Sequence, residues 1–186
     1  MNEKEIQYVI DDARKFNRYC LYEESLEKLN EVILPIKNKD LEQEILKLKS
    51  FIYRKLQEPD MALIYINQAL QCIKNHNFID KNIKYAICLM NKGVIYDEQK
   101  KYMQAIREYT IAVDIFRNDF KKTNDEGKLI NSLITLGTAY FHNKQYDLAK
   151  NIFEEAMSDF KFDKVSDARY RYIEKMLKEI KKNEHF

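Results

Sequence analysis

Apolar and small residues recur along most of the chain at the spacing of an α-helix. Leu89, Gly93 and Tyr96, for example, fall on one face of a helix that turns by about 100° per residue. The sequence holds only 3 Gly and 2 Pro, so few residues interrupt helices. The pattern predicts an all-α protein with helices near residues 3–19, 22–37, 40–57, 60–76, 80–99, 102–122, 125–143, 146–162 and 165–183.

The helical pattern repeats. At 3, 12, 16 and 19 positions after Gly93 stand Tyr96, Ala105, Tyr109 and Ala112. The same offsets from Gly137, which lies 44 residues further on, give Tyr140, Ala149, Phe153 and Ala156. Weaker copies upstream consist of Ser50, Tyr53, Ala62, Ile66 and Ala69, and of Ala13, Phe16, Ser25, Leu29 and Val32. We therefore expect one solenoid domain over residues 1–186, with two-helix repeats at about 5–38, 40–77, 80–122 and 125–162 and a capping helix at 165–183.

The two glycines have a structural explanation. Glycine inside a helix costs roughly 1 kcal/mol relative to alanine, so glycines at equivalent places predict that a neighbouring backbone approaches closely. We expect Ala105 and Ala149 to form the small surfaces opposite Gly93 and Gly137. The aromatic and leucine positions then fill the space between helices and between repeats.

The two complete copies read LMNKGVIYDEQKKYMQAIREYTIA and LITLGTAYFHNKQYDLAKNIFEEA. They resemble the tetratricopeptide repeat (TPR), in which Leu-Gly-x2-Tyr is followed by alanine, an aromatic residue and alanine. Leu136 keeps the residue before glycine, whereas Lys92 replaces it in the other copy. The resemblance implies a right-handed superhelix of paired helices that binds peptides or proteins.

The repeat is also long. A period of 44 residues, with Asn91 two positions before Gly93, resembles the peptide-sensing regulators of Gram-positive bacteria, the Rap, NprR and PlcR group. This resemblance implies the ligand-sensing part of a cytoplasmic, quorum-sensing-like regulatory protein related to transcriptional regulators. Two features depart from that group: the sequence begins directly with a repeat, and it has fewer repeats than the sensors do.

In the third and fourth repeats, the face of the first helix opposite its glycine is the predicted ligand-binding groove, and the same register gives the corresponding face in the first two repeats. Its N-terminal part is basic, its middle is apolar, and its C-terminal part is uncharged and able to form hydrogen bonds. Asparagine amides suit an extended peptide backbone, and arginines suit a carboxylate. The candidate residues are Arg14, Arg18, Lys47, Phe51, Arg54, Ile87, Asn91, Val94, Glu98, Asn131, Thr135, Thr138 and His142.

Two alternatives remain open for these positions. The basic residues also suit a solvated face with ion pairs one turn apart, such as Asp11 with Lys15. Leu48 and Phe51 also suit burial against the neighbouring repeat if the register differs by one residue.

Charge and cysteine usage limit the function classes. The chain carries 32 basic and 30 acidic residues, a net charge of +2 that gives no general attraction for nucleic acid. No apolar stretch is long enough for a signal peptide core or a membrane span, which favours the cytoplasm. Cys20, Cys72 and Cys88 are odd in number and widely spaced, as expected for buried thiols rather than disulfides.

Candidate chemistry is sparse. Cys72 and His76 are spaced as half of a zinc site, but no second pair completes it. His142 has Asp147 across a turn, yet no nucleophile is placed beside it. We therefore expect no catalysis, no metal and no cofactor.

The interpretation is a non-catalytic module that binds a short peptide or a protein tail. The alternative is a constitutive scaffold that assembles other proteins. A second copy of the chain, giving a homodimer, is a further candidate partner.

Overall fold

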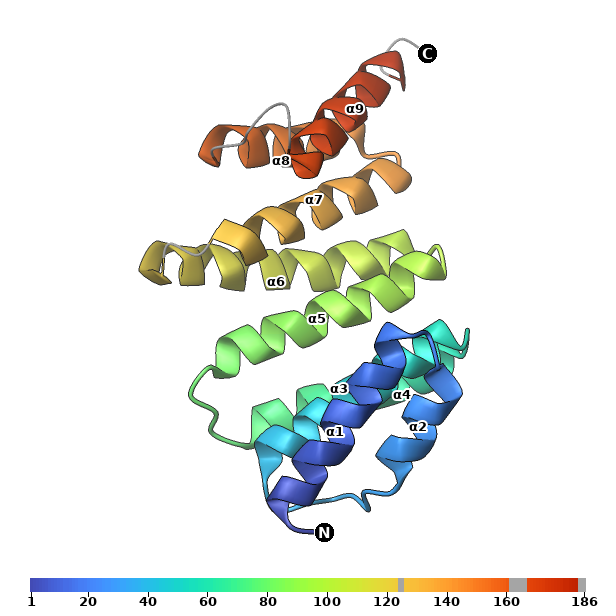
Figure 1. The fold of residues 1–186 in the computed structure, drawn as a ribbon. Coiled ribbons are helices and arrows are strands. Elements are labelled where there is room, and N and C mark those ends of the chain that lie inside the picture. Colours follow the sequence, from blue (N-terminus) through green and yellow to red (C-terminus); the bar gives the residue numbers. More distant parts are fainter. Residues whose placement is uncertain (124–125, 161–166, 184–186) are drawn as a thin grey trace. The chain divides into compact units, whose positions relative to one another are not determined.

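The computed structural model describes residues 1–123, 126–160 and 167–183. Within these ranges the chain is helical and contains no strand, which confirms the all-α prediction. The helices are α1 (Glu3–Arg18), α2 (Tyr22–Asn30), α3 (Lys39–Lys55), α4 (Pro59–Asn75), α5 (Lys81–Glu98), α6 (Tyr102–Thr123), α7 (Glu126–His142), α8 (Tyr146–Asp159) and α9 (Ala168–Asn183) (Figure 1).

The chain divides into two compact units, Met1–Ile95 and Tyr96–Phe186. In the first unit α1 packs on α2, α3 packs on α4, and α3 also lies against α1 and α2. In the second unit α7 lies between α6 and α8, and α9 contacts both α7 and α8. The prediction of one solenoid domain stays a prediction, and we describe each unit by itself.

Local signals in the sequence set where several helices begin. Asn2 and Glu5 form a capping box, in which the Glu5 amide donates to the Asn2 side chain over 3.0 Å and the Asn2 amide donates to the Glu5 carboxylate over 2.8 Å. Asn38 accepts hydrogen bonds from the first amides of α3. Pro59 occupies the first turn of α4, where its missing N–H costs nothing.

One tight turn recurs in every repeat and joins its two helices. Each turn has a residue with a left-handed backbone, with φ between 59° and 61°, and that residue is never glycine. The next residue donates its amide across the turn to a carbonyl five positions back, which closes the C-terminus of the first helix. The left-handed residues are Cys20, Gln57, Lys100 and Lys144. These four residues occupy the same position in the turn of each repeat. The backbone conformation therefore shows the repeat without reference to the side-chain pattern.

The second helix is shorter than predicted. The sequence predicted a helix over 22–37, but α2 ends at Asn30, with Glu31 as its C-cap. Pro35 lies in the part that is not helical, because proline has no amide hydrogen to donate and its ring clashes with the preceding turn. The expected boundary of the first repeat near residue 38 is unaffected, since Asn38 caps α3.

Two predicted helix ends fall on residues that the structure does not describe. The predicted end of α8 at 162 and start of α9 at 165 lie outside the described residues. Asp167 precedes α9, and its carboxylate accepts the Arg169 backbone amide over 2.8 Å. This contact satisfies an amide at the helix start that has no partner within the helix.

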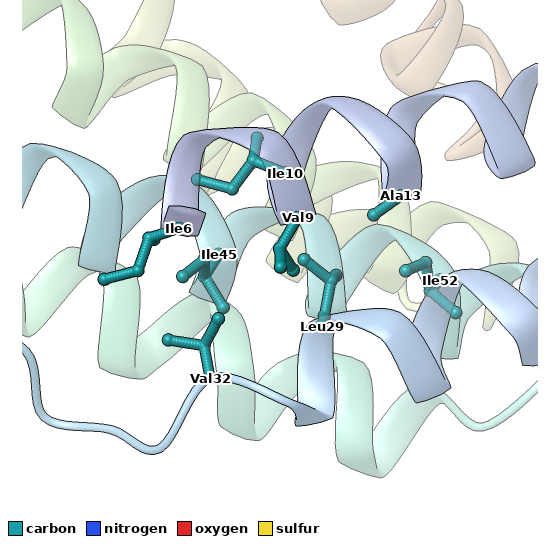
Figure 2. Close-up of a cluster of buried hydrophobic side chains, with 8 residues drawn as sticks. All are labelled: Ile6, Val9, Ile10, Ala13, Leu29, Val32, Ile45 and Ile52. Atoms are coloured by element: carbon teal, nitrogen blue, oxygen red, sulfur yellow. The ribbon is translucent and has the colours of Figure 1, made fainter. Parts of the chain in front are cut away.

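The core of the first unit is aliphatic. Figure 2 shows side chains from α1, α2, α3 and the segment after α2 that point toward one another. All are at most 5% exposed: Ile6, Val9, Ile10, Ala13, Leu29, Val32, Ile45 and Ile52. Burial of each large side chain contributes roughly 1.5–3 kcal/mol before the entropy of ordering is subtracted.

The small residues of the repeat face each other as expected in the first two repeats. The Ser25 hydroxyl donates to the Ala13 carbonyl over 2.9 Å, and the Ser50 hydroxyl donates to the Ala62 carbonyl over 2.8 Å. In the first repeat the serine belongs to the second helix, and in the second repeat it belongs to the first helix. In both cases its hydroxyl bonds to the backbone of the other helix of the pair. Such contact requires the closely approaching backbones that the small residues predict.

In the fourth repeat the close neighbour is a side chain. The Phe153 ring of α8 lies against Gly137 of α7, and no Ala149 atom is among the nearest three. The nearest neighbour of this glycine is thus an aromatic ring, and the expected approach of Ala149 stays a prediction.

An ion pair also joins α6 to α8 in this unit. The Arg117 guanidinium donates to both Glu155 carboxylate oxygens over 2.9 and 2.7 Å.

Candidate functional site

The predicted groove positions lie on the exposed faces of the first helices of the repeats, α1, α3, α5 and α7. We call each of these a first-helix face, and we describe those of the two units separately.

On α1 the two predicted arginines differ. Both are exposed, but Arg14 donates to Asp11 over 2.9 Å and also forms an ion pair with Glu44 of α3. It therefore ties α1 to α3, and the prediction of a pair between Asp11 and Lys15 is replaced by this arrangement. No carboxylate in the described structure lies within ion-pair distance of Arg18.

The first-helix face of α3 centres on Phe51, which is half-buried and packs against the core of the first unit. The edge of Tyr22 meets its ring at a centroid distance of 6.3 Å. The Arg54 guanidinium lies 5.2 Å and the Lys55 ammonium 5.7 Å from the ring centroid. Such contacts hold cations in place over an electron-rich surface. Lys47, also predicted, is half-buried on the same helix.

Near the C-terminus of α1, Asn17 carries an unsatisfied amide. Both polar atoms of its side chain are shielded from solvent, and neither has a hydrogen-bond partner among the described residues. A buried amide without partners costs roughly 1–3 kcal/mol, so native structures rarely keep one without reason. No pattern in the sequence shows that this side chain lacks a partner.

On α5 the three residues predicted for the middle of the groove, Ile87, Asn91 and Val94, are half-buried, and Glu98 is exposed. The opposite side of α5 is buried at Cys88, Leu89 and Gly93, so the predicted division of faces agrees with burial.

The first-helix face of α7 borders a pocket. Asn131 and His142 are exposed, Thr135 and Thr138 are half-buried, and the buried residues of α7 lie on its other side. The Thr138 hydroxyl is 2.9 Å from the Tyr172 hydroxyl of α9. A shallow, open pocket of about 370 Å³ lies between the two helices and is lined by Asn131, Ile134, Thr135, Ala168, Arg169 and Tyr172.

The pocket carries little net charge. The Arg169 guanidinium forms two hydrogen bonds with the Asp167 carboxylate, over 3.1 and 2.7 Å. This bonding holds the pKa of Asp167 down at about 2. The sequence predicted only a capping role for α9 and did not point to Arg169 and Tyr172, because no local pattern predicts contact between α7 and α9.

His142 pairs with a residue other than the predicted one. Its Nδ1 atom lies 3.5 Å from an Asp97 carboxylate oxygen at the end of α5, not beside Asp147. The Tyr102 ring lies 5.4 Å from the imidazole, centroid to centroid. The imidazole therefore lies between a carboxylate of α5 and an aromatic ring of α6.

The thiols differ in exposure. Cys72 and Cys88 are buried as predicted, but Cys20 is exposed, because it occupies the turn after α1. Burial raises the pKa of Cys88 to about 11. The His76 ring bonds the Cys72 carbonyl over 2.9 Å rather than its sulfur. The ranges that the structure covers contain no cluster of three His, Cys, Asp or Glu residues that could hold a metal.

None of the described helices is both long enough and apolar enough to cross a membrane.

Comparison with known proteins agrees with the fold. Residues 130–158 match the family model of the tetratricopeptide repeat. No curated protein sequence matches the chain. Among solved structures, the chain is similar to the apo form of RapI, with a TM-score of 0.78 and 14% identity over 97% of this chain and 49% of RapI.

Two other structures have the same fold. BtubC from P. vanneervenii gives a TM-score of 0.69 and 20% identity, covering 98% of this chain and 72% of BtubC. The yeast histone chaperone Hif1, described as a scaffold protein, gives 0.69 and 13% identity, covering 97% and 96%. This chain spans about half of RapI, and identities this low establish the fold alone. The chain thus has the tetratricopeptide-repeat fold.

Proposed function

We propose that the chain is a non-catalytic module whose first-helix faces bind a short peptide or a protein tail. The pocket between α7 and α9 is the observation that carries the proposal. A tetratricopeptide-repeat fold and a structural likeness to RapI support it.

The pocket suits one apolar side chain of a peptide together with its backbone. Ile134, Ala168 and the Tyr172 ring supply apolar surface. The exposed Asn131 amide can donate to a peptide carbonyl and accept from a peptide N–H. The Arg169 charge is neutralised by Asp167, so the pocket does not itself favour a charged residue.

The first unit carries a basic face of its own. Arg18 is exposed, and Arg54 and Lys55 are held over the Phe51 ring, so this face attracts an acidic side chain or a terminal carboxylate. The Asn17 amide is shielded from solvent, so a ligand can satisfy it only after neighbouring side chains move. We therefore expect a peptide with both an apolar residue and a negative group.

A displayed library of random peptides tests this proposal. We expect selection to enrich sequences that pair an aliphatic or aromatic residue with Asp or Glu. Asn131→Ala and Arg54→Ala should each weaken binding of the selected peptides about tenfold, since each removes a hydrogen-bonding or charged contact. Asn67→Ala and Arg107→Ala make the same changes at exposed positions of α4 and α6 and should leave binding unchanged. Equal affinity for all four variants would exclude the first-helix faces as the site.

The ligand-sensing part of a bacterial regulatory protein is the finer form of the proposal, and a constitutive scaffold is the alternative. The likeness to RapI favours the sensor, whereas the likeness to Hif1 favours the scaffold. A sensor must change its conformational equilibrium when its ligand binds. Small-angle scattering of the free and peptide-loaded protein separates the two: a sensor becomes more compact, and a scaffold keeps its radius of gyration.

A further inference from the structure

The outer face of α9 carries a stripe of basic side chains. Its members recur at four-, three- and four-residue intervals, which places them within about 60° around the helix. They are exposed, and they lie opposite the buried residues Ile173, Met176 and Ile180. Over eleven residues the stripe is about 16 Å long at 1.5 Å per residue. We call it the basic stripe, and it consists of Arg171, Lys175, Lys178 and Lys182.

The basic stripe stands out against the charge of the chain. Helix α9 has six basic and two acidic side chains, a net charge of +4, whereas the whole chain has only +2. Lys178 pairs with Glu174 at 3.5 Å and Lys182 with Glu179 at 2.9 Å. No carboxylate in the described ranges lies within ion-pair distance of Arg171 or Lys175. Two of the four positive charges of the stripe are thus not neutralised by an ion pair.

The second helix carries the complementary pattern. Glu23, Glu27 and the C-cap Glu31 recur four residues apart along its outer face, and Glu24 lies beside them. All four are exposed and lie opposite the buried residues Ser25 and Leu29. Three of them have no cation within ion-pair distance in the part of the chain that the structure describes, whereas Glu31 pairs with Lys28 at 3.0 Å. We call this the acidic stripe, and it consists of Glu23, Glu24, Glu27 and Glu31.

We propose that the basic stripe on α9 of one copy of this chain docks on the acidic stripe on α2 of a second copy. Each stripe carries four like charges on a helix face that no other described helix covers. Side chains one turn apart on two helices can interleave as ion pairs along both axes. Glu174 and Glu179 flank the basic stripe and would repel a phosphate backbone, which disfavours nucleic acid as the occupant.

Apolar contact supports the acidic side of this interface. Leu21 is 40% exposed before the N-terminus of α2, and Ile33 is 86% exposed beyond its C-terminus. Exposed apolar residues at both ends of a charged stripe give a second copy something to bury. Exposed ion pairs contribute little individually and are screened by salt, so the contact is weak and salt-sensitive.

The contact joins two different surfaces, so it is heterologous. After one contact forms, one copy keeps a free α2 and the other keeps a free α9, so further copies can add head to tail. The association is independent of the first-helix faces, and it leaves open the peptide pocket between α7 and α9.

Sedimentation velocity over a concentration series tests the proposal. We expect self-association at 50 mM NaCl that weakens about tenfold or more at 500 mM NaCl. Arg171→Glu with Lys175→Glu should abolish it, and so should Glu23→Lys with Glu27→Lys. Mixing these two double variants should restore association, because each then presents the charge that the other lacks. Lys121→Glu with Lys122→Glu makes the same charge change at exposed positions of α6 and should have no effect.

Several results would overturn the proposal. A protein that stays monomeric at low salt up to about millimolar concentration does not dock in this way. Association that survives either double reversal uses other surfaces. Failure of the mixture to associate, when both variants show native circular dichroism, means that the two stripes do not pair with each other. A salt-dependent change that is independent of concentration places the contact within one chain.

Discussion

The Phe153 ring occupies the space that a side chain on Gly137 would need. A Cβ atom on Gly137 would lie 2.8 Å from Cε1 and 3.0 Å from Cζ of that ring. Phe153 is fully buried, so the ring cannot move aside at low cost.

Gly137→Ala should therefore destabilise the protein, although alanine favours a helix by about 1 kcal/mol. Overpacking costs about 1–3 kcal/mol, and we expect a net loss of about 1 kcal/mol in the free energy of unfolding. Urea denaturation followed by circular dichroism measures it. Adding Phe153→Leu to Gly137→Ala should cost less than the sum of the two single changes, because leucine leaves room for the methyl group. Simple additivity would mean that the ring is not the obstacle.

The turn after α7 offers a stabilising change. Lys144 has φ of 59°, a conformation that costs a side chain energy but glycine nothing. Lys144→Gly should raise the free energy of unfolding by about 0.5 kcal/mol, after the entropy of the unfolded glycine is subtracted. The matched control is Lys150→Gly inside α8, which should lower it by about 1 kcal/mol. A loss of stability in both variants would contradict the left-handed turn.

Cys88 should make stability depend on alkaline pH. Burial raises its pKa from 9.0 to about 11 in the folded protein, so between these values the unfolded chain releases a proton that the folded chain keeps. The free energy of unfolding should therefore fall as pH rises from about 9 to about 11. Cys88→Ala should lose stability at every pH but show a shallower fall over this range. An unchanged slope in this variant would assign the fall to other groups.

The thiols should also differ in reactivity. At pH 8, iodoacetamide should label the exposed Cys20 and spare Cys72 and Cys88, whose buried sulfurs are inaccessible and whose pKa values burial raises. Peptide mapping by mass spectrometry reads the three sites separately. Equal labelling of all three in the folded protein would contradict the burial of α4 and α5.

Asn17 should carry a stability cost that serves binding. Asn17→Leu removes two polar atoms that have no hydrogen-bond partner and should raise the free energy of unfolding by about 1 kcal/mol. The same change should weaken binding of a selected acidic peptide. Thermal unfolding and peptide titration of one preparation measure both effects. A stabilised variant with unchanged affinity would show that Asn17 has no part in the site.

The sequence predicted the helices well where periodic apolar residues and capping residues agree. Asn2, Asn38 and Pro59 lie at the starts of their helices, and the repeat offsets found the small residues that meet, such as Ala13 with Ser25. These features depend on neighbours along the chain. Periodicity therefore suffices for them.

The sequence predicted the structure less accurately where a contact joins residues far apart in the chain, or where one proline interrupts a helical pattern. Extending α2 past residue 30 gave too little weight to Pro35. Pairing His142 with Asp147 overlooked Asp97, which approaches from α5. The pocket required Tyr172 of α9 to meet α7, a tertiary contact without a local signal. The predicted faces of α5 and α7 agree with burial, whereas their role in binding stays a prediction.

The central claim is that ligands bind on the first-helix faces. Amide chemical shifts of the labelled protein, recorded while a library-selected peptide is added, test it most directly. We predict that the largest changes fall on Asn131, Thr135 and Tyr172 around the pocket and on Asn17, Phe51 and Arg54 in the first unit. Changes confined to the second helices α2, α4, α6 and α8 would contradict the claim.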